Sequence, residues 1–236
     1  MYAVEKFLRS YQRGPVLVWK DMRHLPLCNA LHLQPIVVSG IEQLAGIVEE
    51  VTPTCLVVRG FDSELIKLVR QSVPGSVLPL VVIVDTFPPE AEMAAVGDIP
   101  HLLLCHGAVS GYPEFCERIR EIGSNGQILS AHTGILVKRA QRYMETHAKG
   151  MVTRWKIAES VNTSEDYLTR IFKKELGMSP WEYLSRYRVE LSVKLLQETD
   201  LPLSEIAMRC GFQDQAYYCR VFKKLKHATP GSLRLP

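Results

Sequence analysis

The sequence WKIAESVNTSEDYLTRIFKKELGMSPW, residues 155–181, recurs in altered form as LSEIAMRCGFQDQAYYCRVFKKLKHATPG, residues 203–231. The Ile-Ala pair of the first copy (157–158) matches the pair of the second copy with an offset of 49 residues, whereas the Phe-Lys-Lys triplet (172–174) matches with an offset of 50. The second copy therefore carries one additional residue in the turn between these motifs. An internal repeat of this kind indicates one structural unit that occurs twice.

Each copy is predicted to form two helices joined by a tight turn. In the first copy, residues 155–161 form the short helix, Ser164 caps the second helix by accepting hydrogen bonds from its free N–H groups, and Gly177 ends it. In the second copy, Gly211 lies in the turn and Asp214 takes the capping position. The buried residues of the first copy are expected to be Ile157, Ala158, Val161, Leu168, Ile171 and Phe172.

This burial pattern leaves a polar side on the second helix of each copy. The predicted DNA-contacting residues are Asp166, Thr169, Arg170, Lys173 and Lys174 in the first copy, and Gln215, Ala216, Tyr217, Arg220 and Lys223 in the second. Polar groups in the middle of such a helix suit base edges, and cations near its end suit phosphates. A single helix of this kind would more often be an ordinary solvated surface, but two matching copies favour DNA binding.

The segment between the copies is predicted to be one long helix from Pro180 to Glu198, with Ser179 as its cap. Nineteen residues at about 1.5 Å each make a helix roughly 28 Å long. Successive major grooves on one side of a duplex lie ~34 Å apart. One chain is therefore predicted to place two recognition helices in adjacent major grooves.

The net charge of +3 is unevenly distributed along the chain. Residues 1–130 hold 10 Lys and Arg against 14 Asp and Glu, whereas residues 131–236 hold 18 against 11. The excess of positive charge in the C-terminal part is what a phosphate-facing domain requires.

The C-terminal part resembles the AraC/XylS family of transcription regulators. The resemblance covers about residues 135–236 and depends on RVELSVKLL, which begins at Arg188, followed by TDLPLSEIAMRCGFQDQAYYCRVFKK and a later Thr-Pro. Ser192 stands where the family often has Ala, and His227 stands near a position that is usually Gly, which is expected either to strain the last turn or to change its shape. The resemblance implies a seven-helix, all-α domain with two helix-turn-helix motifs and base contacts from both recognition helices. The helix after Thr229 is expected to be short.

The N-terminal part alternates short apolar runs with segments of helical periodicity. The predicted strands are residues 15–19, 35–39, 54–59, 78–85 and 101–105, and the predicted helices are residues 41–51, 64–73, 89–96 and 113–122. Continuous apolar runs between helices are typical of parallel strands that are covered on both faces. We therefore expect a flavodoxin-like α/β domain with a five-stranded parallel sheet over residues 1–127, a linker helix region at 128–148 and the DNA-binding domain over 135–236.

Five parallel strands in this position resemble the receiver domain of two-component response regulators. The resemblance implies an acidic magnesium site, an Asp phosphoacceptor, a hydroxyl residue and a Lys at successive strand ends. The remnants of such a site are Asp21, Asp62, Thr86 and His106. Arg59 lies at the acceptor position, Asp62 comes a few residues later, and Cys105 precedes His106 where the Lys is expected. Because magnesium needs several oxygen ligands, a pseudo-receiver that takes no phosphate is predicted.

Three other functions remain open from the residues alone. An enzyme is disfavoured, because the sequence has no G-x-S-x-G, G-x-G-x-x-G, Walker A or H-E-x-x-H motif. A small-molecule site at the strand ends, near Asp85, Thr86 and His106, is one alternative, and an active receiver with Asp62 as phosphoacceptor is another. The short segment before the first predicted strand leaves room for a companion domain upstream.

The expected partners are double-stranded DNA, a second copy of the chain bound through the N-terminal domain, and RNA polymerase or another regulatory protein. Neither a long apolar segment nor a secretory signal is present, so a cytoplasmic location is expected. The six cysteines form no Cys-x-x-Cys pair and are expected to be buried thiols, with no metal and no cofactor.

Overall fold

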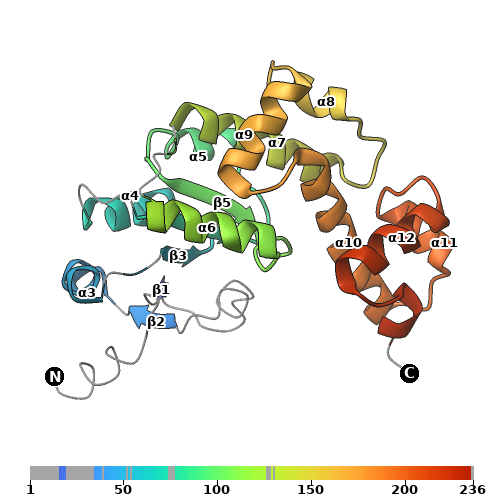
Figure 1. The fold of residues 1–236 in the computed structure, drawn as a ribbon, viewed down its shortest axis with the longest axis horizontal. Coiled ribbons are helices and arrows are strands. Elements are labelled where there is room, and N and C mark those ends of the chain that lie inside the picture. The colour runs from blue at the N-terminus through green and yellow to red at the C-terminus, as the bar shows by residue number, and fades with distance from the viewer. Residues whose placement is uncertain are drawn as a thin grey trace. The chain divides into compact units, whose positions relative to one another are not determined.

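The computed structural model describes residues 16–19, 35–38, 40–51, 53, 55–73, 78–125, 129 and 131–234. The chain forms two compact units, one of residues up to 138 together with 174–177, and one of residues 139–173 together with 178–236. Figure 1 shows the strands in the first unit and, in the second, a succession of helices.

The first unit contains a parallel sheet. In the part of the chain that the structure describes, the strand order is β2-β1-β3-β4-β5. The strands are β1 (Val16–Trp19), β2 (Pro35–Val38), β3 (Leu56–Arg59), β4 (Leu80–Val84) and β5 (Leu102–His106). Every pairing is parallel, and β4 lies between β3 and β5 with Val57 opposite Val81 and Val81 opposite Leu103. All strands therefore end at the same edge of the sheet.

A helix follows each of the strands β2 to β5, as the alternating pattern predicts. These helices are the 3-10 helix η1 (Ile41–Gln43), α3 (Leu44–Val51), α4 (Ser63–Gln71), α5 (Glu90–Ala94) and α6 (Pro113–Asn125). All five residues of β4 are buried, which explains why its sequence is a continuous apolar run and not an alternating one. Val82 of β4 belongs to a core cluster with Ile66 of α4 and Met93 of α5. Burial of this cluster holds the strands and helices of the unit together.

The second unit is built from helices. They are α7 (Ala131–His147), which begins in the first unit, α8 (Arg154–Glu159), α9 (Glu165–Leu176), α10 (Pro180–Glu198), α11 (Leu203–Arg209), α12 (Gln215–Lys226) and the 3-10 helix η2 (Pro230–Leu233). Helix α10 has the bounds that the sequence predicts. Ser179 forms a capping box with Glu182, in which each side chain accepts a hydrogen bond from the other residue's backbone N–H.

The buried side chains of the second unit include all six that the repeat predicts for the first copy. Ile157, Ala158, Val161, Leu168, Ile171 and Phe172 are between 0 and 6% exposed. The Phe172 ring packs edge-on against Tyr183 of α10, with 5.9 Å between the ring centroids. In the second copy, Tyr218 and Phe222 are fully buried with Phe212 and Ile206. The two copies thus use matching positions to pack against α10.

The last turn of α12 ends at His227, which has a left-handed backbone with φ of 55°. This conformation is costly for residues with a Cβ, so the strain expected at this position is present. The helix after Thr229 is the four-residue η2, short as expected.

Within the described ranges, no helix is both long enough and apolar enough to cross a membrane. Four of the described cysteines, Cys55, Cys105, Cys116 and Cys210, are buried reduced thiols, whereas Cys219 is half-buried.

Candidate nucleic-acid interface

The first helix-turn-helix unit consists of α8, a turn and α9. Thr153 accepts a hydrogen bond from the backbone N–H of Lys156 and caps α8, a cap that the sequence analysis missed. The Ser164 hydroxyl accepts from the N–H of Tyr167 at 3.2 Å, which confirms the predicted cap of α9. The two caps satisfy N–H groups that a helix start leaves free, and so they define where each helix begins.

The predicted polar side of α9 lies opposite its buried side. Asp166, Arg170, Lys173 and Lys174 are exposed, and Thr169 is half-buried. The Arg170 guanidinium carbon lies 5.1 Å from the centroid of the Tyr167 ring. This cation–π contact restrains a long side chain whose donors fit the edge of a guanine base. The structure therefore leaves these five side chains accessible, and their contact with DNA stays a prediction.

In the second helix-turn-helix unit, Asp214 caps α12 by accepting the N–H of Tyr217 at 2.7 Å. The predicted contact residues Gln215, Ala216, Arg220 and Lys223 are exposed, and Tyr217 is half-buried. The Tyr217 ring packs against Phe212, with 6.1 Å between centroids. In the described part of the chain, Arg220 has no aromatic or carboxylate partner, unlike its counterpart Arg170. The two polar faces are alike in sequence, but within the described residues only the arginine of the first face, Arg170, packs on an aromatic ring.

The turns of the two copies explain why the offset between matching residues changes from 49 to 50. Asn162 and Gly211 are equivalent, because each has a positive φ and sits at an offset of 49. The next residue in each copy donates its N–H to the Ala of the Ile-Ala pair, Thr163 to Ala158 and Phe212 to Ala207. Ser164 and Asp214 are then both caps. The additional residue of the second copy is therefore Gln213, which is exposed immediately before the cap of α12.

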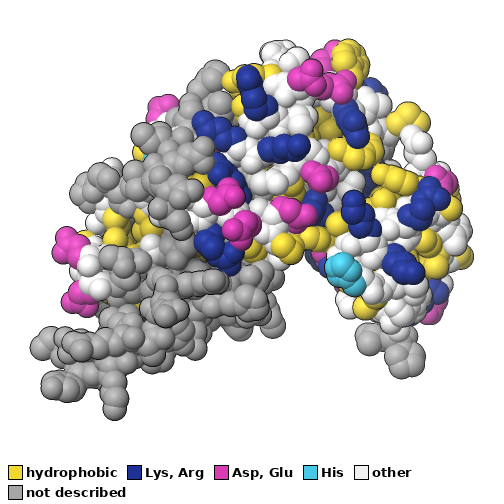
Figure 2. Space-filling model, in the orientation of Figure 1, with side chains coloured by type: hydrophobic (Ala, Val, Ile, Leu, Met, Phe, Trp, Pro, Cys, Tyr) yellow, Lys and Arg dark blue, Asp and Glu magenta, His cyan; other side chains and the backbone are white. Residues whose placement is uncertain are grey.

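Helix α10 connects the two units and, at 19 residues, is roughly 28 Å long. Figure 2 shows Lys and Arg side chains spread over the helices of both helix-turn-helix units. The length of α10 and this distribution of positive charge fit two contacts with one duplex, as the sequence predicts.

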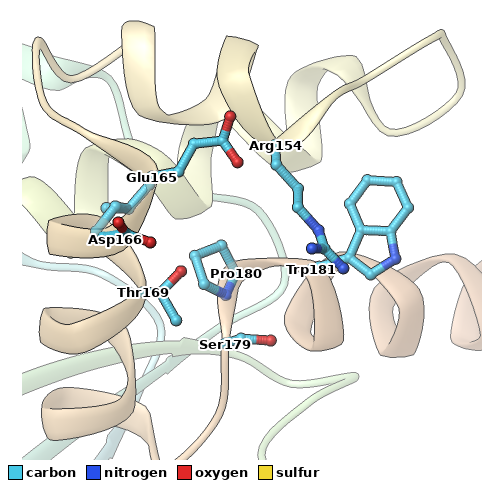
Figure 3. A pocket seen from close by; sticks show the side chains of 8 residues that line it. Arg154, Glu165, Asp166, Thr169, Ser179, Pro180 and Trp181 are labelled. Atoms are coloured by element: carbon cyan, nitrogen blue, oxygen red, sulfur yellow. The ribbon is translucent and has the colours of Figure 1, made fainter.

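A hollow of about 280 Å³ adjoins the first recognition helix, and we call it the first hollow. It is lined by Arg154, Glu165, Asp166, Leu168, Thr169, Ser179, Pro180 and Trp181. In Figure 3 the Arg154 side chain extends toward the indole of Trp181, and its guanidinium carbon is 5.8 Å from the ring centroid. Sequence reasoning did not select Arg154, and it counted Trp181 among the apolar residues of α10. No local signal reveals this pair, because 27 positions separate its members.

The remnants of the receiver-like site lie at the strand ends of the first unit, except Asp21, which is outside the described residues. Asp62 caps α4, since its Oδ1 accepts the N–H groups of Glu64 and Leu65 at 3.0 Å each. Thr86 is exposed.

Arg59, at the expected acceptor position, forms an ion pair of 3.4 Å with Asp85 at the end of the neighbouring strand. His106 lies beside them. Its Nδ1 accepts the N–H of Ala108 at 3.0 Å, and its Nε2 is 2.8 Å from the carbonyl oxygen of Asp85. Because Nδ1 accepts, the proton of a neutral ring is on Nε2 and is donated to Asp85.

Comparisons with known proteins agree with the geometry of the second unit. The helix-turn-helix domain family matches residues 157–235. The uncharacterized HTH-type transcriptional regulator YijO of Escherichia coli strain K12 is 32% identical over 113 residues, which are 48% of this chain and 40% of that protein. A second such regulator, YtdP of Bacillus subtilis strain 168, is 40% identical over 78 residues, 33% of this chain and 10% of that protein. The chain thus spans less than half the length of either relative.

Among solved structures, the chain is similar to the C-terminal domain of AraT, a response regulator from Geobacillus stearothermophilus. The two are 38% identical over 42% of this chain and 83% of that one, with a TM-score of 0.41. Residues 157–235 therefore match a helix-turn-helix domain, and the chain is similar to HTH-type transcriptional regulators.

Proposed function

We propose that this protein is a sequence-specific transcription regulator that places α9 and α12 in adjacent major grooves of one DNA duplex. The observation that carries the proposal is the pair of matching polar helix faces on either side of α10. A length of roughly 28 Å approaches the ~34 Å between successive major grooves, and the width of the helices at each end adds to that span. The names of its relatives as HTH-type transcriptional regulators support the same function.

The residues proposed to contact DNA are the two exposed faces described above. Arg170 and Arg220 are proposed to contact guanine edges, because a guanidinium offers two parallel donors to the O6 and N7 acceptors of guanine. Lys173 and Lys223 lie one turn further along their helices and are proposed to bind phosphates.

Selection of bound sequences from a random duplex pool, with the full chain at moderate salt, tests this proposal. We expect two conserved half-sites about one helical turn apart, and loss of one half-site from the selected pool when Arg170→Ala or Arg220→Ala is used. A pool with no enriched sequence would contradict the proposal, and a single enriched half-site would contradict the use of both helices.

We further propose that the first unit is a flavodoxin-like pseudo-receiver that works without phosphorylation, through dimerisation, binding of another protein or an unidentified ligand. The groups at the strand ends support this. Asp62 is engaged as a helix cap, and the Arg59 cation at the acceptor position is paired with Asp85. A cation thus stands at the position where a phosphoacceptor carboxylate would be needed, and magnesium needs several oxygen ligands.

Labelling with acetyl phosphate separates the pseudo-receiver from an active receiver. We expect no incorporation into the full chain, with an authentic receiver protein as positive control. Incorporation that disappears in Asp62→Asn would show that the first unit is an active receiver.

A further inference from the structure

A second hollow, also in the second unit, has a volume of about 340 Å³. Its wall includes Met151 and Val152 from the loop before α8, together with Phe212 and Gln213 from the second turn. Trp181 lines both hollows. The two hollows are therefore neighbours, and the Trp181 side chain borders both of them.

Each hollow reaches one of the two polar helix faces. The first is bordered by Asp166 and Thr169 of α9, and the second by Tyr217 and Arg220 of α12. Trp181 consequently lies between the two recognition helices. Successive major grooves on one side of DNA are separated by the two sugar–phosphate backbones and a minor groove. If α9 and α12 lie in successive major grooves, the backbone between these grooves must therefore pass Trp181.

The chemistry around Trp181 suits such a backbone. The Arg154 side chain is exposed and its guanidinium lies over the indole, 5.8 Å from the ring centroid. In the described ranges, Arg154 has no carboxylate within ion-pair distance, although Glu165 and Asp166 line the same hollow from α9. An arginine that is stacked on an aromatic ring keeps its N–H groups available for a phosphate.

Apolar surface lines the second hollow beside Trp181. Met151, which lines the second hollow, is 73% exposed, more than the other large apolar side chains that the structure describes as exposed. A methionine and an indole at this place offer the apolar contact that the carbon face of a deoxyribose accepts. The exposure of Met151 beside the half-buried Trp181 then has a reason.

We propose that the Arg154–Trp181 pair is a third DNA contact, which binds a phosphate of the backbone segment between the two major grooves. Arg154 donates to the phosphate, and Trp181 positions Arg154 and packs against sugar. The contact carries no base information, so its role is to set the register of the two recognition helices on the duplex. This inference rests on the proposed DNA-binding function and adds a site to it.

The salt dependence of binding to the selected two-site duplex tests the pair. For Arg154→Ala, the slope of log K against log salt is expected to be smaller in magnitude by about one, with the same order of preference among duplex sequences. Lys156→Ala is the matched control, because it removes one exposed cation from the same short helix two positions further on. Equal slopes for Arg154→Ala and wild type would overturn the proposal.

A modified duplex tests the same contact without changing the protein. When the phosphates between the two half-sites are replaced by uncharged methylphosphonates, the wild-type chain is expected to lose affinity and Arg154→Ala to lose none. Trp181→Phe keeps an aromatic platform and is expected to behave like wild type, whereas Trp181→Ala is expected to match Arg154→Ala. Equal losses in wild type and Arg154→Ala would contradict the pair, whereas absence of sequence preference in the wild-type chain would instead contradict the proposed function.

Discussion

Gly211 lies so close to the carbonyl oxygen of Ala148 that a Cβ on this glycine would be only 2.0 Å from it. The same oxygen accepts a hydrogen bond of 2.9 Å from Nε of the buried Arg188, whose Nη2 donates to the oxygen of Gly150 at 3.0 Å. Arg188 on α10 thus binds the loop before α8 through hydrogen bonds, and its guanidinium carbon lies 5.9 Å from the ring centroid of Phe212 in the second turn. The glycine leaves the space that this arrangement needs.

Gly211→Ala is therefore expected to destabilise the protein by at least about 2 kcal/mol, through a steric clash and a left-handed backbone with φ of +82°. Thermal or urea unfolding followed by circular dichroism measures the change. Gly231→Ala is the matched control, because a Cβ there meets nothing within 4 Å. Equal stability of the two variants would show that the turn relaxes without cost.

Arg170→Ala is expected to weaken binding to the selected duplex by ~1–3 kcal/mol, because the proposed bidentate contact with a base is lost. Tyr167→Ala is expected to lose part of the same energy, since the ring lies 5.1 Å from the guanidinium and restrains it. Tyr167→Phe keeps the ring and serves as control. Fluorescence anisotropy on specific and random duplexes measures both effects, and an equal loss on the two duplexes would argue against base contact by Arg170.

Lys173→Ala is expected to lower affinity for all sequences alike and to reduce the magnitude of the salt slope by about one, because a lysine at this exposed position neutralises a phosphate. The measurement is a titration series at several salt concentrations. A change in sequence preference, with an unchanged slope, would place Lys173 on a base instead.

Burial raises the pKa of Glu145 on α7 to about 8, although the Tyr183 hydroxyl donates to it at 2.8 Å. The unfolded chain has a glutamate pKa of about 4.3, so the folded state holds the proton more tightly. Stability from this group is fully present below pH 4.3 and is lost progressively as pH rises to about 8, by at most ~1.4 kcal/mol per pH unit.

Glu145→Gln keeps the shape and an acceptor for Tyr183 but does not ionise. Its unfolding free energy is expected to fall less than that of wild type between pH 5 and 8, and to exceed the wild-type value at pH 8. Urea unfolding at a series of pH values measures this difference. Parallel curves for the two proteins would mean that Glu145 titrates normally in the folded state.

His227→Gly is expected to raise the free energy of unfolding by up to about 1 kcal/mol, because glycine adopts the left-handed conformation at the end of α12 without steric cost. The His227 side chain is exposed, so its removal exposes no core. The change in melting temperature checks this, and a lowered temperature would show that the imidazole makes a stabilising contact.

Local sequence signals were sufficient for the helices of the DNA-binding region. The helix caps at Ser164, Ser179 and Asp214 and the buried side of α9 were all predictable. Each depends on residues three or four positions apart, and such spacings specify a helix start or a helix face before any tertiary contact forms.

Local sequence spacings did not predict contacts between residues that are far apart in the sequence. The position of Arg154 over Trp181 and the hydrogen bonds from Arg188 to the loop before α8 arise where segments far apart in the sequence meet. At the strand ends, the pairing of Arg59 with Asp85 follows from the adjacency of β3 and β4.

The amino-acid sequence by itself determined that two similar helical units occur, which side of each is polar and how long the connecting helix is. Periodicity, capping residues and chain length suffice for these, because they act over a few neighbouring positions. Only the tertiary structure decided which side chains from different helices meet between the two polar faces. Their distances depend on how α8, α10 and the second turn pack together, and packing is a property of the whole unit.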